Sequence, residues 1–175
     1  KDVVLQTPTA TVIYDAQGNA VVNQDVGGQY SYKVVDRSGR LWYDIDAKGY
    51  ITEYTRNAFG DVKQLTRYAA PISLAGRGAT PLTSTNVQAF LATANHAADR
   101  SIVTQYDALG RTVKVIEPQA YAYDANHALA ASYFTAGKAT ETVYNALGDL
   151  LKQSVYGQDA SGSRSTVAAD TYFSY

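Results

Sequence analysis

A short polar unit recurs along this chain: eight times an Asp or Asn is followed three residues later by a Gly. An Asp or Asn at the first corner of a type I turn accepts backbone hydrogen bonds, and a Gly at the fourth corner closes a bulged hairpin in the left-handed conformation. We therefore interpret these residues as structural turns. The eight pairs are Asp15/Gly18, Asp25/Gly28, Asp36/Gly39, Asp46/Gly49, Asn57/Gly60, Asp107/Gly110, Asn145/Gly148 and Asp159/Gly162.

The spacing of the turns predicts the elements between them. The first five units begin at residues 15, 25, 36, 46 and 57, which are 10 or 11 residues apart. Once the four turn residues are removed, six or seven remain for each strand, or about 20 Å of extended chain. These residues are β-branched and aromatic, as in segments 12–14 and 113–116. We predict an all-β fold, an antiparallel meander of hairpins with successive turns at opposite ends.

Four of the turns are entered through tyrosine, at Tyr14, Tyr106, Tyr123 and Tyr144. The stretch 106–111, YDALGR, is similar to the typical unit of the RHS/YD-repeat family, and 144–148 and 57–60 are near copies. The resemblance covers residues 12–68 and 101–157. The chain departs from the pattern where Asp124 is followed by His127 in place of Gly, and the turns at Asp25 and Asp159 lack the tyrosine.

The resemblance implies a structural function. The family includes bacterial polymorphic toxins, the C components of insecticidal toxin complexes, wall-associated proteins and the animal teneurins. In its toxin members the repeats spiral into a hollow shell around a C-terminal effector. The resemblance thus implies a secreted or cell-surface, non-catalytic segment that encapsulates or presents a toxin or effector. The teneurin relatives leave open an alternative, a surface adhesion or carbohydrate- or protein-binding module.

One insertion interrupts the repeat, because the turns at Asn57 and Asp107 begin 50 residues apart. Its first part, 69–81, has the Pro and Gly content of a loop. Its second part has apolar residues at helical spacing and three possible N-caps. We expect a short amphipathic helix that covers one face or edge of the sheet; the alternative is a contact surface for cargo or a neighbouring chain. The spaced residues are Val87, Phe90, Leu91, Ala94 and Ala97 or Ala98, and the caps are Thr83, Ser84 or Thr85.

The pattern predicts three segments and open sheet edges. The segments are hairpins over 1–68, the insertion over 69–100, and further hairpins over 101–175, with an irregular stretch from Glu117 to Lys138. We expect the repeat to continue in neighbouring sequence, because the pattern stops within a unit. The partners that we expect are neighbouring repeats of the same parent chain, an encapsulated effector, and a second copy that pairs with an open edge near residues 1–13 or 165–175.

Composition argues against several other functions. A net charge of -1 provides no basic face for nucleic acid, and no apolar run is long enough to cross a membrane. The absence of cysteine removes disulfides and thiolate zinc sites. Each turn Asp is a single carboxylate followed by small or apolar residues, unlike a calcium loop. We expect no cofactor and no metal.

Few residues are candidates for chemistry. His96, on the predicted helix, and His127 have no adjacent set of metal ligands, so we expect surface roles. The three glutamates, Glu53, Glu117 and Glu141, lie in or beside predicted strands, where exposed polar positions explain them. Packing between strands is the simplest explanation of the 15 tyrosines, and sugar stacking is the alternative. We assign no catalytic residue, and the self-cleavage motif of the family's C-terminal core is absent from this sequence.

Overall fold

The computed structural model describes residues 9–123, 133–159 and 161–174 of the chain. This part contains one helix and twelve strands, and the chain divides into two compact units. The first unit is formed by residues 1–54 and 67–99, and the second by residues 55–66 and 100–175. The elements are β1 (Thr11–Tyr14), β2 (Ala20–Gln24), β3 (Tyr30–Val35), β4 (Leu41–Ile45), β5 (Ile51–Arg56), β6 (Val62–Arg67), α1 (Ser84–Leu91), β7 (Arg100–Tyr106), β8 (Thr112–Ile116), β9 (Ala120–Tyr123), β10 (Tyr133–Tyr144), β11 (Leu150–Gln158) and β12 (Arg164–Tyr172).

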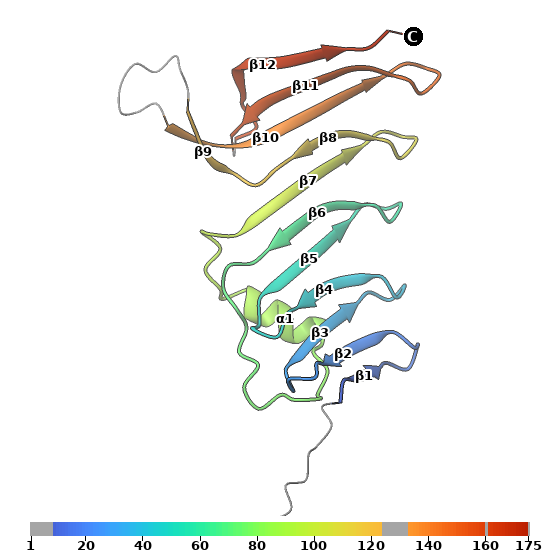
Figure 1. Ribbon diagram of the computed structural model, residues 1–175, viewed down its shortest axis with the longest axis vertical. Coiled ribbons are helices and arrows are strands. Elements are labelled where there is room, and N and C mark those ends of the chain that lie inside the picture. The colour runs from blue at the N-terminus through green and yellow to red at the C-terminus, as the bar shows by residue number, and fades with distance from the viewer. Residues whose placement is uncertain (1–8, 124–132, 160, 175) are drawn as a thin grey trace, which may run out of the picture. The chain divides into compact units, whose positions relative to one another are not determined.

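The first unit is an antiparallel meander in which β1 to β5 pair in chain order (Figure 1). Pairing of Tyr32 with Ile45, and of Ile45 with Ile51, places these three side chains on one face of the sheet. All three are almost fully buried. This face therefore carries the core of the unit.

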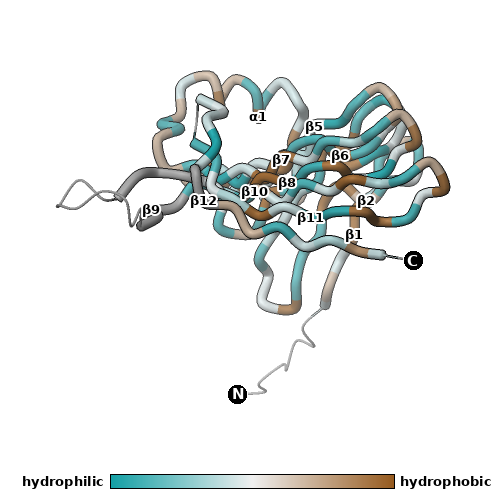
Figure 2. Tube along the Cα trace, turned by 90° about the horizontal axis from the view of Figure 1, so that it is seen from above, coloured by the Kyte–Doolittle hydropathy of each residue, from teal (hydrophilic) through white to brown (hydrophobic). Residues whose placement is uncertain are grey.

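Helix α1 covers the buried face of the first unit. Val87 and Leu91, one turn apart on the helix, belong to the same apolar cluster as Tyr32, Ile45 and Ile51. Seen from above, α1 lies to one side of the strands (Figure 2). Residues 72–82 of the loop add Ile72 and Leu82 to this cluster, so the insertion is part of the core of the unit.

The helix begins where the sequence predicts and ends earlier. Thr83 is the N-cap: its Oγ1 accepts from the backbone N–H of Asn86 at 3.2 Å, and Asn86 Oδ1 accepts from the backbone N–H of Thr83. The helix ends at Leu91, so the predicted spacing is wrong for Ala94 and for Ala97 or Ala98. His96 is also placed wrongly by that prediction, because it lies in the turn that follows the helix.

The second unit continues the antiparallel pattern with β6, β7, β8, β10, β11 and β12 in that order, while β9 pairs with one end of β10. Its described buried side chains are few and small or polar: Thr66, Ala139, Ser154 and Tyr156. The apolar strand residues Val103, Val113 and Val155 are only half-buried. In contrast to the first unit, the described part of this sheet has no covering helix.

The predicted fold class is confirmed: the described chain is mostly an open antiparallel meander with one short helix. Among the described residues, no strand pairs with the outer edge of β1 or of β12. The predicted degenerate turn at Asp124 and His127 lies outside the described residues. None of the described helical segments is both long and apolar enough to span a bilayer.

Candidate functional site: the repeated turn and the ties between hairpins

All eight predicted turns have one geometry. Each glycine N–H donates to the carbonyl of the Asp or Asn three residues earlier at 2.9–3.1 Å, and the N–H of that Asp or Asn donates to the carbonyl four residues later at 2.8–3.0 Å. The strand register shifts by one residue beside several turns, as at Ile13/Tyr14 and Gln105/Tyr106. The glycines all have a positive φ: Gly18 83°, Gly28 79°, Gly39 75°, Gly49 89°, Gly60 101°, Gly110 77°, Gly148 97° and Gly162 90°.

The turn glycines share one backbone conformation, but their surroundings differ. A Cβ would meet no described atom within 4 Å at two of them, Gly18 and Gly110. At four others it would approach only a side chain, at 3.3–4.0 Å: Gly28, Gly39, Gly148 and Gly162. At Gly49 it would overlap the backbone carbonyl oxygen of Ile72. Gly49 is therefore required by packing against the insertion as well as by the turn, which the sequence did not indicate.

The side chain of the first turn residue reaches further than the sequence indicates. In all eight turns its Oδ1 accepts the backbone N–H of the residue four positions later, at 2.8–3.0 Å. One carboxylate or amide oxygen therefore spans the whole turn and satisfies a donor where the next strand begins. This bond explains why Asp or Asn stands first in every unit.

A second contact follows a rule that sequence reasoning missed. In five turns the side chain four positions after the first residue binds the outer oxygen or nitrogen of that residue. Asp is paired with Asn or Arg, and Asn is paired with Asp, so each pair contains a single Asp. The pairs are Asp15 with Asn19, Asp36 with Arg40, Asn57 with Asp61, Asp107 with Arg111 and Asn145 with Asp149. The i, i+4 complementarity was visible in the sequence and would have indicated these contacts.

Hydrogen bonds lower the pKa of four turn carboxyls below the ordinary value of 3.8. The side chain of Asn19 is the main cause at Asp15, the backbone N–H of Arg40 at Asp36, and the hydroxyl of Ser161 at Asp159. At Asp107 desolvation is the largest single influence and raises the pKa, but the hydrogen bonds from Arg111 and Leu109, with the Arg111 charge, outweigh it. These hydrogen bonds therefore favour the ionised form of the four Asp carboxyls.

Tyrosines that enter the turns of the second unit tie neighbouring hairpins together. The Tyr106 hydroxyl donates to the carbonyl of Val62 on β6 at 3.0 Å, and the Tyr144 hydroxyl donates to the carbonyl of Thr112 on β8 at 3.2 Å. Both rings are half-buried. Each hydroxyl therefore holds a hairpin to the strand before it. Tyr14 departs from the expected packing, because its ring is 61% exposed.

Arg111 adds a second tie between hairpins. Its Nε lies 2.6 Å from Asp107 Oδ2 within its own turn, and its guanidinium stands 4.6 Å from the centre of the Tyr144 ring of the next hairpin. A cation over an aromatic face is attracted by the ring. The YDALGR stretch therefore joins two consecutive hairpins through its Tyr and its Arg.

Three turns of the second unit present large apolar side chains to solvent. Phe59, Leu109 and Leu147, the third residues of their turns, are 88%, 76% and 89% exposed. These turns lie at one end of the strands, and successive turns are two strands apart (Figure 1), or about 10 Å. Gln17 and Ser38 hold the same position in turns of identical geometry, so the turn itself does not require an apolar residue there.

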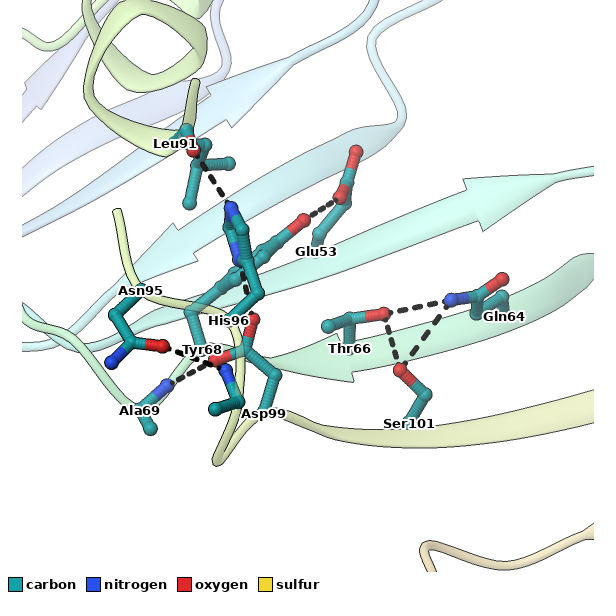
Figure 3. A network of polar contacts seen from close by, with 11 residues as sticks. Glu53, Gln64, Thr66, Tyr68, Ala69, Leu91, Asn95, His96, Asp99 and Ser101 are labelled. Atoms are coloured by element: carbon teal, nitrogen blue, oxygen red, sulfur yellow. Dashed lines mark hydrogen bonds and ion pairs between the residues drawn. The ribbon is translucent and has the colours of Figure 1, made fainter. Parts of the chain in front are cut away.

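Glu53 is half-buried and bonded, so its predicted exposed position is wrong. Its Oε2 accepts from the Tyr68 hydroxyl at 2.5 Å (Figure 3). Its Oε1 accepts from Trp42 Nε1 at 3.2 Å. Burial and the neighbouring carboxylate raise the pKa of Tyr68 well above its ordinary value. Burial, with the Glu53 charge, also raises the pKa of Tyr43 to about 12. These phenols stay protonated and act as donors.

His96 lies against Tyr68 in an edge-on ring contact, with 5.6 Å between the ring centres. Its Nδ1 is 2.7 Å from Asp99 Oδ2, and its Nε2 is 2.8 Å from the carbonyl oxygen of Leu91 (Figure 3). Asp99 Oδ1 also accepts from the backbone N–H of Ala69 at 2.7 Å. The surface role that we expect for His96 thus includes a network that the sequence did not indicate.

The second unit contains two polar clusters of its own. Thr66 Oγ1 and Ser101 Oγ lie 2.9 Å apart, and Gln64 donates to both (Figure 3). Elsewhere the Tyr156 hydroxyl donates to Glu141, while the Arg164 guanidinium stands 3.8 Å from the Tyr156 ring centre. In the described part of this unit, polar bonds between strands are more prominent than buried apolar side chains.

The described carboxylates and histidines form no group of three or more that could hold a metal ion. Glu117 pairs with Lys138 at 2.5 Å and Glu141 with Tyr156 and Arg164, so each has a partner within the sheet. His127 lies outside the described residues. The chemistry of the described site is hydrogen bonding that holds strands together.

No protein-family model matches this chain, and no curated protein does. Among solved structures, a chain of the Photorhabdus luminescens Tc holotoxin pore with a mutated TccC3 is 11% identical, with a TM-score of 0.29, over 89% of this chain and 9% of that one. A chain of a TcdB2–TccC3 complex is also 11% identical, with a TM-score of 0.27, over 93% of this chain and 10% of that one. The chain spans about a tenth of the length of the chains that it matches.

Proposed function

We propose that this chain is a non-catalytic structural segment of an RHS/YD-repeat shell that encapsulates or presents a toxin or effector outside the cell or at its surface. The observation that carries the proposal is the tie between consecutive hairpins through Tyr106, Arg111 and Tyr144. The hairpins that contain Tyr106 and Tyr144 are each bonded to the preceding hairpin by residues of the repeat itself. Such a unit can be added many times to lengthen a wall.

The energetics of the repeat also support a wall. In repeat proteins each unit is stabilised mainly by its neighbours. Among its described residues the second unit has few buried apolar side chains, and it relies on turns, hydroxyl ties and cross-strand polar pairs. A sheet of this kind gains stability from added hairpins on either side. In this proposal the partners are neighbouring repeats, and the enclosed space would hold the effector.

Electron microscopy of the longer protein that contains this segment tests the shell directly. The proposal predicts a closed, hollow particle whose wall is one sheet thick, with this segment in the wall. Limited proteolysis would then leave an enclosed effector intact until the wall is cleaved. A solid or extended particle with no enclosed space would overturn the proposal.

The exposed apolar turns favour a second function, a protein-binding surface module. Phe59, Leu109 and Leu147 form a row of solvent-exposed side chains in the described structure, and rows of exposed apolar side chains are typical of protein interaction sites. Cell-surface binding is measured for the protein and for a variant with Ser at all three positions, and the comparison distinguishes the two functions. Binding that depends on the row favours adhesion, and binding unchanged by the variant removes the support for it.

A further inference from the structure

Both ring nitrogens of His96 lie within hydrogen-bond distance of an acceptor. Nδ1 is 2.7 Å from a carboxylate oxygen of Asp99, and Nε2 is 2.8 Å from the backbone carbonyl of Leu91. A neutral imidazole has one N–H, whereas the imidazolium has two. The carboxylate of Asp99 is itself an acceptor for the N–H of Ala69. Only the protonated ring satisfies both of its contacts.

The groups around His96 favour the positive charge. Asp99 is the carboxylate in direct contact, and the Tyr68 ring packs edge-on with its hydroxyl bonded to the Glu53 carboxylate. Helix α1 contains no charged residue, and its C-terminal carbonyl end, which includes Leu91, attracts cations. The described contacts of His96 therefore place carboxylates and carbonyl oxygens around the ring.

These contacts join the two ends of the insertion. Ala69 follows β6 at the start of the insertion, and Asp99 stands at its end, directly before β7. One Asp99 oxygen binds the Ala69 N–H and the other binds His96, which also holds the last residue of α1. The loop and helix between residues 69 and 99 are thus closed by two side chains.

We propose that His96 and Asp99 form a proton-operated latch, which holds the ends of the insertion and the C-terminus of α1 together while His96 is protonated and loosens when it loses its proton. On deprotonation the proton passes to water, and the neutral ring keeps one N–H. Either Asp99 or the Leu91 carbonyl then loses its donor. This inference concerns the insertion and does not depend on the shell proposed above.

The direction of the effect follows from the pKa of His96, which the Asp99 hydrogen bond, followed by the Leu91 carbonyl, raises above its ordinary value of 6.5. A raised pKa in the folded state contributes stability that is fully present below the unfolded value. That contribution is lost as the pH rises through the folded value. The latch is therefore closed below the ordinary pKa of histidine and loosens as the pH rises through the raised pKa of His96.

Nitrogen NMR of the histidine rings in the full chain tests the latch without any variant. The expected result is that His96 titrates above 6.5 and that both of its ring nitrogens carry protons at about pH 6. The variant His127→Gln identifies which signal belongs to His96. Asp99→Asn, which replaces the charged carboxylate with a neutral amide, should lower the pKa of His96. A His96 signal that titrates at or below 6.5, or that shows one neutral tautomer at about pH 6, would overturn the latch.

Hydrogen exchange at single amides tests the mechanical part. After correction for intrinsic exchange, protection of the Ala69 N–H and of the N–H groups of residues 92–94 should fall severalfold as the pH rises through the His96 titration. In His96→Gln the pH-dependent step should vanish, while His127→Gln should keep it. Protection that does not change with pH in the unmodified chain would contradict the proposal, even if the variant fails to fold.

Discussion

Turn glycines with the same backbone geometry are not expected to lose the same free energy of unfolding when they are substituted. Gly110 and Gly49 both close a turn in the left-handed region, but only Gly49 lies against the backbone of Ile72. The insertion is packed onto that turn, because the Ile72 N–H also donates to the carbonyl of Gly49 at 2.9 Å. A side chain at Gly49 would therefore disturb both the turn and the insertion.

We expect Gly110→Ala to lower the free energy of unfolding by about 1–2 kcal/mol, the cost of a left-handed L-residue. Gly49→Ala should cost clearly more, because the new methyl group must displace the backbone of Ile72 as well. Urea denaturation measures both values, with the exposed Leu109→Ser as a control that should change stability by less than about 0.5 kcal/mol. Equal losses for the two glycine variants would show that the contact with Ile72 carries no energy.

The hydroxyl groups of Tyr106 and Tyr144 should contribute to the stability of the fold. Tyr106→Phe and Tyr144→Phe each remove one hydroxyl donor and keep the ring, so each should destabilise the fold by about 1 kcal/mol. Tyr14→Phe is the matched control, because the Tyr14 ring is largely exposed, and it should have little effect. Thermal melts compare the three variants. Equal melting temperatures in all three variants would show that the hydroxyl ties do not stabilise the repeat.

At the scale of elements, the turns and the helix start could be predicted from the sequence because both depend on residues three or four positions apart. Asp107 and Gly110 define a turn by themselves, and Thr83 caps α1 through Asn86. The end of α1 could not be predicted from its apolar spacing. There His96 binds the Leu91 carbonyl and the chain turns back toward Ala69, a contact that spans the insertion.

The network around Glu53 shows the same limit. Tyr68 lies 15 residues from Glu53, and their contact depends on both side chains sharing the buried face of the sheet. The alternation of side chains along a strand is compatible with Glu53 on either face of the sheet. Which face it takes depends on the register of all the strands in the sheet. The backbone turns were therefore predicted because they are local, although the i, i+4 side-chain pairs within them were missed. The contacts of Glu53 and His96 were missed because the fold brings distant residues together.

For α1 itself, the structure changes which side chain should matter most. Leu91 is buried, whereas Phe90 is only partly buried. Leu91→Ala should therefore cost about 2–5 kcal/mol, as is usual for a buried leucine, and Phe90→Ala should cost less than the 3 kcal/mol or more typical of a buried ring. Thr85→Ala on the exposed side of the helix is the control. Chemical denaturation in which Phe90→Ala is the more damaging change would contradict this packing.

At the scale of the whole molecule, two sets of titrating groups set opposite limits on stability. Four turn carboxyls have a pKa below 3.8, so their contribution is present above that value and is lost as the pH falls through their folded values. His96 has a pKa above 6.5, and its contribution is lost as the pH rises through its folded value. Both contributions are complete only between these two limits.

We therefore expect the melting temperature to be highest between about pH 4 and pH 6.5 and to fall on both sides. His96→Gln should flatten the alkaline side alone. Asp36→Asn should weaken the acid side, and it should fold because Asn57 and Asn145 hold the same position in other turns. Scanning calorimetry across pH measures the profile. A melting temperature that rises steadily from about pH 6.5 to pH 9 in the unmodified chain would contradict the assignment of His96.

We propose that this meander is a wall segment whose edges require neighbouring strands. Unpaired N–H and C=O groups along an exposed edge strand template pairing with another chain. In the described structure β1 and β12 each have one unpaired edge. In isolation the chain should self-associate through such an edge, or its edge strands should exchange their amide hydrogens rapidly.

Light scattering over a concentration series, combined with hydrogen exchange at β1 and β12, tests this claim most directly. We expect either a mass that rises with concentration, with protection appearing at the paired edge, or a monomer whose edge strands exchange quickly. A chain that stays monomeric at every concentration, with both edge strands fully protected, would be a closed and independent domain and would contradict the account.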